Sequence, residues 1–252
     1  EGNDLANTII GNGGKSILYG LGGNDILWGG GASADTLDGG TGADRMLGQG
    51  GNDLYIVDNA RDVVNEPLNG GMDTVQASVT HTLAANVEVL LLTGGAAIDG
   101  TGNALGNSIT GNGAANLLSG MAGADTLSGG VGNDTLVGGA GADSLIGGGG
   151  QDAFRFNAAS EFGDRIADFS PGVDHIEIAR GALGNLLPAG TLSAGALTDG
   201  SVASGAGAQM LYDGASGVLR WDADGAGGQA PVIVATLSGA PHLTASDIIL
   251  IG

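Results

Sequence analysis

The chain of 252 residues contains 53 glycines, 5 prolines and no cysteine, and aromatic residues make up 4% of it. Its 27 acidic and 7 basic residues sum to a net charge of −20, which excludes nucleic acid as a partner because such binding requires a basic face. Disulfides and thiolate metal sites are excluded as well, and no apolar run approaches the length of a membrane span.

Residues 1–56 follow a period of nine residues and are predicted to form a first repeat array. Each unit carries a polar residue, and a large apolar residue stands two positions after it. The polar positions are Asn7, Ser16, Asp25, Asp35, Asp44 and Asp53. Because successive side chains on a strand face opposite sides, the apolar residue is expected to point inward. One inserted residue within 29–38 is the only break in the period.

Residues 57–99 lose the glycine rhythm and are predicted to be a bridging β-strand segment of the same solenoid. Val75, Ala77 and Val79 alternate with polar residues, and VEVLLL (87–92) is a short apolar run. Asp58, Asp62 and Asp73 in this segment are candidates for one further cation or for turn caps.

Residues 100–156 form a second predicted array. Its polar positions are Asn107, Asn116, Asp125, Asp134, Asp143 and Asp152. The two arrays match position by position at an offset of 100 before the inserted residue and 99 after it, so the chain carries an internal duplication. Where asparagine or serine replaces aspartate, the turn carries less charge, and amide contacts are expected in place of an ion. These turns are the expected entrances of the arrays.

Residues 157–252 lie outside the period and are predicted to form a C-terminal β cap. FGDRIADFSPGVDHIEI (162–178) indicates two short strands around a Pro-Gly turn. QMLYDGASGVLRWDADG (209–225) indicates a hairpin, and APVIVATLSG (230–239) one more strand.

The complete unit reads G-G-x-G-x-D-x-(apolar)-x, as in GGVGNDTLV (129–137). Its glycines permit positive φ and bring carbonyl oxygens close together, while the aspartate supplies charge. Calcium takes 6–8 hard oxygen ligands in a flexible geometry and fits such a turn, whereas magnesium prefers a tighter octahedron and zinc prefers histidine or thiolate. The units therefore predict several Ca2+ sites.

These units resemble the RTX (repeats-in-toxin) family of secreted proteases, lipases, epimerases, cytolysins and adhesins. The resemblance implies an all-β, right-handed parallel β-roll (β-solenoid) with two nonapeptide arrays and a C-terminal β cap, in which each calcium lies between turns one coil apart. It pairs Asp25 with Asp44, Asp35 with Asp53, Asp125 with Asp143, and Asp134 with Asp152. It also implies carbonyl ligands from Gly20, Gly22, Gly39, Thr41, Gly120, Ala122, Gly129, Val131, Gly138, Ala140, Gly147 and Gly149.

The tail resembles the C-terminal region of serralysin-type RTX proteases and related type I secretion substrates. Asp247, Ile248, Ile249, Leu250 and Ile251 match the acidic and hydrophobic end of an uncleaved export signal. The resemblance implies the type I secretion apparatus as a partner, an extracellular location, and folding when calcium is met outside the cell.

Several alternatives remain open at this stage. Glycine-rich acidic chains are often disordered, although disorder requires no register of nine. Asp164, Asp168 and Asp174 are candidates for a further calcium or for turn caps, as are Asp222 and Asp224 in WDADGAGG.

No catalytic constellation emerges, since His81, His175 and His242 stand in no metal or catalytic motif. The chain is expected to be the C-terminal part of an exported protease or lipase whose catalytic domain precedes it. The alternative is part of an extracellular structural, surface-layer or adhesin protein with a cell-surface or matrix partner.

Overall fold

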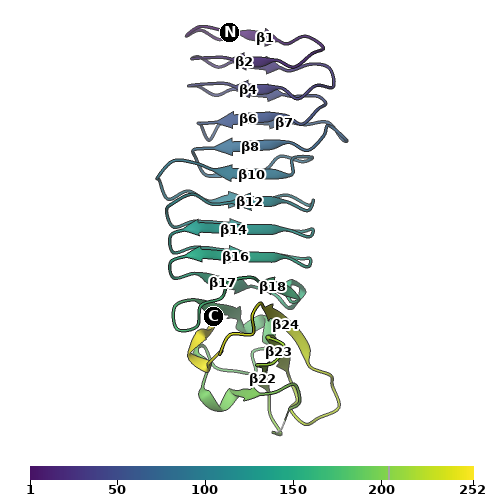
Figure 1. Ribbon diagram of the computed structural model, residues 1–252, viewed down its shortest axis with the longest axis vertical. Helices are drawn as coiled ribbons and strands as arrows, with labels where there is room; N and C mark the ends of the chain where they lie inside the picture. Colours follow the sequence, from purple (N-terminus) through teal and green to yellow (C-terminus); the bar gives the residue numbers. More distant parts are fainter. Residues whose placement is uncertain (204) are drawn as a thin grey trace.

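The computed structural model describes residues 1–203 and 205–252, which form a tall stack of short strands (Figure 1). Each coil of the chain contributes one strand to each of two facing sheets, and the strand of the next coil pairs with it in parallel. This arrangement confirms the parallel β-roll predicted from the nonapeptide period. The described residues contain no α-helix, only short 3-10 helices. None of these is long and apolar enough to cross a membrane.

One face of the roll is a single sheet of 13 strands that runs the length of the molecule. In spatial order its strands are β2 (Ile17–Tyr19), β4 (Thr36–Asp38), β6 (Leu54–Val57), β8 (Thr74–Ala77), β10 (Val89–Leu92), β12 (Ser108–Thr110), β14 (Thr126–Val131), β16 (Ser144–Gly149), β18 (Asp164–Ile166), β24 (Val232–Leu237), β23 (Val218–Asp222), β22 (Gln209–Asp213) and β21 (Leu197–Asp199). The bridging segment supplies β8 and β10, so this sheet continues from one array into the next.

The opposite face is divided into two sheets. The first contains β1 (Thr8–Ile10), β3 (Ile26–Trp28), β5 (Arg45–Leu47) and β7 (Val63–Asn65). The second contains β9 (His81–Thr82), β11 (Gly100–Thr101), β13 (Leu117–Ser119), β15 (Thr135–Val137), β17 (Ala153–Phe156), β19 (His175–Ala179), β25 (Ile248–Ile251) and β20 (Gly190–Thr191). The division falls between β7 and β9, within the bridging segment.

The core is a column of apolar side chains between the facing sheets. The middle residue of a three-residue strand points inward while its neighbours point to solvent, which is the expected alternation. The fully buried members in the two arrays are Leu27, Leu37, Met46, Tyr55, Ile109, Leu118, Leu127, Leu136, Leu145 and Phe154. Ile9, on the first coil, is only partly buried. The inserted residue within 29–38 lengthens one turn without changing which residues face the core.

The C-terminal segment extends both faces of the roll. β24, β23 and β22 form the predicted hairpin and additional strand, and β24 joins the long sheet beside β18. Four short 3-10 helices complete the segment as the structure describes it: η1 (Ala159–Glu161), η2 (Arg180–Leu183), η3 (Ala194–Ala196) and η4 (Ala245–Asp247). The chain end returns to the roll, where β25 pairs with β19 (Figure 1).

Candidate metal centre

The repeat aspartates connect successive coils through one of their two carboxylate oxygens. The backbone N–H at the equivalent position of the preceding coil donates to Oδ1 of each aspartate, at N···O distances of 2.6–2.9 Å. The donor and acceptor residues are the implied pairs Asp25 and Asp44, Asp35 and Asp53, Asp125 and Asp143, and Asp134 and Asp152. The structure thus brings all four pairs together, one coil apart.

The second oxygen, Oδ2, has no hydrogen-bond partner among the residues that the structure describes. These buried oxygens belong to Asp25, Asp35, Asp44, Asp53, Asp73, Asp125, Asp134, Asp143, Asp152 and Asp164. A buried carboxylate oxygen without a partner costs on the order of 1–3 kcal/mol or more. Its repetition in both arrays indicates that these oxygens serve a ligand outside the protein chain.

The first glycine of each unit forms the other side of this arrangement. A Cβ on Gly120 would collide with Asp125 Oδ2 and with the carbonyl oxygen of Gly138 on the next coil. The same holds for Gly129, whose Cβ would meet Asp134 Oδ2 and would lie 2.6 Å from the Gly147 carbonyl oxygen. A carboxylate oxygen and a carbonyl oxygen from successive coils therefore converge where a side chain would otherwise stand. Such hard oxygen donors fit calcium.

The predicted carbonyl ligands fall into two groups. The first residues of the units are buried beside the aspartates, namely Gly20, Gly39, Gly120, Gly129, Gly138 and Gly147. The third residues pair with one another across coils, as Gly22 with Thr41, Ala122 with Ala140, and Val131 with Gly149. Most of the third residues lie at the outer rim of the turns, and the Val131 side chain is exposed.

Burial raises the pKa of several aspartates in these rows, namely Asp44, Asp53, Asp125, Asp134, Asp143, Asp152 and Asp164. Desolvation is the largest cause and the neighbouring carboxylates add to it, whereas the backbone N–H donors oppose it. The pKa of Asp53 and that of Asp125 rise to about 6, and that of Asp164 rises to about 8. The charged rows therefore oppose folding unless a cation balances them.

Acidification should stabilise the metal-free roll. Because these pKa values lie above the unfolded value of 3.8, the folded state binds more protons, and the resulting stability is lost as pH rises through about 6 and about 8. We expect the β-sheet signal in far-UV circular dichroism of dialysed, metal-free protein to increase as the pH falls from about 9 to about 5. In calcium the trend should reverse, since protons compete for the same oxygens. A β-sheet signal of the metal-free protein that increases with pH would contradict this assignment.

The same ladder extends beyond the nonapeptides. Backbone N–H groups of Asp44, Asp53, Asp143 and Asp152 donate to Asp62, Asp73, Asp164 and Asp174, respectively. The sequence marked these four acidic residues only as open candidates. The steps to Asp73, Asp164 and Asp174 span 20, 21 and 22 residues and leave the nine-residue register, whereas Asp62 keeps the step of 18 residues but lacks the glycine pattern of a unit.

The acidic residues that continue the ladder beyond the nonapeptides are of two kinds, metal-ligand candidates and turn caps. Asp73 and Asp164 keep an unpartnered Oδ2 within the described part of the chain, as the repeat aspartates do. Asp62 instead accepts a hydrogen bond from Asn59 N, and Asp174 accepts one from Ser170 N. Asp168 accepts hydrogen bonds from two backbone N–H groups of the turn at 147–148. The first two therefore resemble metal ligands, and the other three cap turns.

The asparagine positions at the start of the second array replace the ion with amide hydrogen bonds. Asn107 Nδ2 donates to the carbonyl oxygens of Val87 and Glu88, at 3.1 and 3.3 Å. Asn116 Nδ2 donates to the carbonyl oxygen of Ile98 at 2.5 Å. In the first array, Asn7 Oδ1 accepts from Asn3 N and the Ser16 hydroxyl donates to the Gly14 carbonyl oxygen. The contacts of Asn7, Asn107 and Asn116 agree with the expectation of amide contacts at the array entrances, whereas Ser16 uses its hydroxyl.

The remaining candidates lie apart from the rows. His81 is on β9, where burial lowers its pKa, and His175 is on β19. Asp222 caps its own turn by accepting from the N–H groups of Asp224 and Gly225.

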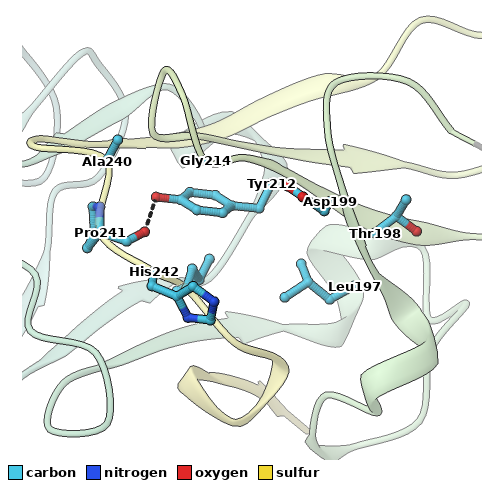
Figure 2. Close-up of a pocket in the computed structure, with 9 residues that line it drawn as sticks. Leu197, Thr198, Asp199, Tyr212, Gly214, Ala240, Pro241 and His242 are labelled. Atoms are coloured by element: carbon cyan, nitrogen blue, oxygen red, sulfur yellow. Dashed lines mark hydrogen bonds between the residues drawn. The ribbon is translucent and has the colours of Figure 1, made fainter.

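A separate cavity of about 380 Å³ lies in the C-terminal cap, and His242 lines it (Figure 2). The Tyr212 hydroxyl donates to the Pro241 carbonyl oxygen there at 2.6 Å, and burial raises the pKa of that hydroxyl. Figure 2 shows this hydrogen bond between two of the residues that line the cavity. Its lining contains none of the repeat aspartates.

The fold and its donors define a repeat protein whose successive coils share oxygen-rich cation sites. The RTX calcium-binding nonapeptide repeat matches the chain in four copies, at residues 1–33, 30–64, 101–136 and 128–158. Both arrays of the chain therefore consist of RTX repeats, which bind calcium.

Two solved structures are similar to the chain. The AlgE6R3 subunit of the mannuronan C5-epimerase from Azotobacter vinelandii is 28% identical, with a TM-score of 0.39, and the match covers 57% of this chain and 78% of that one. The extracellular lipase LipA from Serratia marcescens is 18% identical, with a TM-score of 0.35, and the match covers 100% of this chain and 41% of the lipase. Comparison with curated proteins found no match.

Proposed function

We propose that this chain is the calcium-triggered folding module of an exported bacterial protein. The observation that carries the proposal is the set of buried Oδ2 rows, which oppose folding without a cation and hold coils together with one. Calcium is scarce inside cells and abundant outside, so the chain stays unfolded during passage through a type I secretion apparatus. Outside the cell, calcium closes the roll and stabilises the protein.

The position of the C-terminal segment supports a coupling between folding and export. Asp247 is buried and accepts hydrogen bonds from the N–H groups of Gly172 and Thr244, both at 2.8 Å. β25, which follows it, lies between β19 and β20 in the sheet. A secretion apparatus can read an export signal in this strand only before the chain folds.

Polar substitution of the export segment should abolish secretion. Replacing Ile248, Ile249, Leu250 and Ile251 with asparagine is expected to reduce the exported fraction at least tenfold in cells that carry a type I exporter. The matched control places asparagine at Val232–Ala235 of β24, which also damages a sheet strand. Immunoblots of cells and medium measure the fraction, and equal loss in both variants would contradict a signal in β25.

We propose that the parent protein is an exported enzyme of protease or lipase type, and that this chain contributes no catalysis. The resemblance of the tail to exported proteases supports the first statement, and the separation of the histidines supports the second. The continuity of the long sheet through the bridging segment favours an alternative, an extracellular structural or adhesin protein built of repeats. Sequencing the parent upstream of residue 1 tests both, because a catalytic motif supports the enzyme and further repeats support the alternative.

A further inference from the structure

We propose that Asp53, Glu66 and Asp73 form an additional calcium site where the first array meets the bridging segment. Glu66 and Asp73 lie outside the segments that match the RTX repeat, and Glu66 has no counterpart in the nonapeptide. The inference rests on the proposed function only insofar as both involve calcium uptake by the folded roll.

The three carboxylates converge in the interior of the roll. One oxygen from each lies within 4.8 Å of the others, and Asp53, Glu66 and Asp73 are 2%, 6% and 0% exposed. Asp53 Oδ2, Glu66 Oε2 and Asp73 Oδ2 each lack a hydrogen-bond partner within residues 1–203 and 205–252. Three buried carboxylates that converge and each keep one oxygen without a partner are the donor set of a hard cation.

An irregular coil brings Glu66 into this position. The ladder step from Asp53 to Asp73 spans 20 residues, whereas the step from Asp35 to Asp53 spans 18. The longer coil lets the chain turn inward after β7, where Asn86 Nδ2 holds the Glu66 carbonyl oxygen at 3.0 Å. The site therefore arises from the change in turn length that ends the first array.

A tyrosine hydroxyl completes the lining. Tyr55 is fully buried, and its hydroxyl accepts a hydrogen bond from Gly48 N at 2.7 Å and contacts Glu66 Oε1. A Cβ on Gly48 would collide with Asp53 Oδ2 and the Tyr55 hydroxyl, so this glycine keeps the space open. The site thus differs from the repeat sites by a glutamate and a phenolic oxygen.

The carboxylates around the site favour the binding of a cation. The ion pair that the described residues contain, Arg155 with Glu177, lies elsewhere on β17 and β19. Burial, and then the carboxylates of Asp73, Asp53 and Glu88, raise the pKa of Glu66 to about 8. Calcium affinity increases with the number of charged ligands, and three carboxylates exceed the aspartates of a repeat turn. This site is expected to bind more tightly than the array sites.

Counting bound ions tests the proposal. Wild-type protein and the Glu66→Gln variant are equilibrated with calcium, separated from free ion and analysed for bound metal. We expect the variant to bind one ion fewer, and the missing ion to be the tightest, with at least a tenfold weaker first binding step. Glu177→Gln removes the same charge outside the site and should bind as many ions as the wild type.

Terbium luminescence provides a second readout if Glu66→Gln fails to fold. Terbium replaces calcium at oxygen sites and is excited by an adjacent tyrosine. Tyr55→Phe keeps all three carboxylates, so it should retain the full number of bound ions while losing the tyrosine-excited emission of the tightest ion. If the tyrosine-excited emission of that ion were unchanged in Tyr55→Phe, the proposal would be overturned.

The outcomes separate this proposal from the proposed function. Equal ion counts and affinities in the wild type and Glu66→Gln would overturn the site and would mean that Glu66 is a buried neutral acid. That result would leave the array intact. A wild-type protein that folds without binding calcium would instead overturn the proposed function itself.

Discussion

Removing calcium is expected to unfold the roll. In chelator, the β-sheet signal in far-UV circular dichroism should fall to that of a disordered chain, and calcium at about 10⁻⁴–10⁻³ M should restore it. The reason is the rows of aspartates whose Oδ2 atoms are buried without partners among the described residues, while the core receives few large side chains from each coil.

The return of the signal should be cooperative. One site at tenfold saturation contributes only about 1.4 kcal/mol, so several sites must fill together to stabilise the fold. Because each aspartate bridges two coils, filling one turn positions the donors of the next. A Hill coefficient clearly above one is expected. Magnesium at the same concentration is the control and should restore much less signal, and an identical spectrum in chelator and calcium would exclude calcium-dependent folding.

Gly129→Ala should strongly destabilise the calcium-bound roll. The backbone of Gly129 lies outside the left-handed region, so alanine meets no conformational penalty there. The added Cβ would instead occupy the space between Asp134 Oδ2 and the Gly147 carbonyl oxygen. We expect a loss of about 2–4 kcal/mol in calcium-bound stability, the range of severe overpacking and lost ligand sites. Urea unfolding in saturating calcium measures it.

Gly149→Ala is the matched control. It lies in the same array, and a Cβ at Gly149 meets nothing within 4 Å. The residue paired with it on the preceding coil is Val131, which shows that this position accepts a side chain. A change within about 0.5 kcal/mol is expected, as for ordinary surface substitutions. Equal destabilisation by both alanines would contradict a cation site beside Gly129.

Much of the roll could be predicted from its period. A repeat of nine places an apolar residue at the same position of every unit, so the inward position of Leu127 requires no knowledge of distant contacts. The pairing of Asp125 with Asp143 was implied by the resemblance to the RTX family, in which two units make one coil. The period also marked Asn107 and Asn116 as places where amides replace an ion. Each of these features depends on a fixed number of residues per coil.

Prediction was incomplete where the number of residues per coil changes. Asp73 and Asp164 occupy ladder positions after steps of 20 and 21 residues, and a nine-residue template does not reach them. No pattern in the sequence indicated a role for Glu66, because a lone glutamate before a proline has no periodic partner. Its burial depends on how the bridging coil turns.

The amino-acid sequence by itself determined the repeating coil, the inward apolar column, the aspartate rows and the preference for calcium, because all of these follow from local chemistry repeated at a constant interval. Only the tertiary structure decided which oxygen of each carboxylate accepts a hydrogen bond from the neighbouring coil and which oxygen is left for a ligand. It also decided that Glu66 joins Asp53 and that Asp247 reaches Gly172, 75 residues away. Such contacts depend on the path of irregular turns, which carries no period.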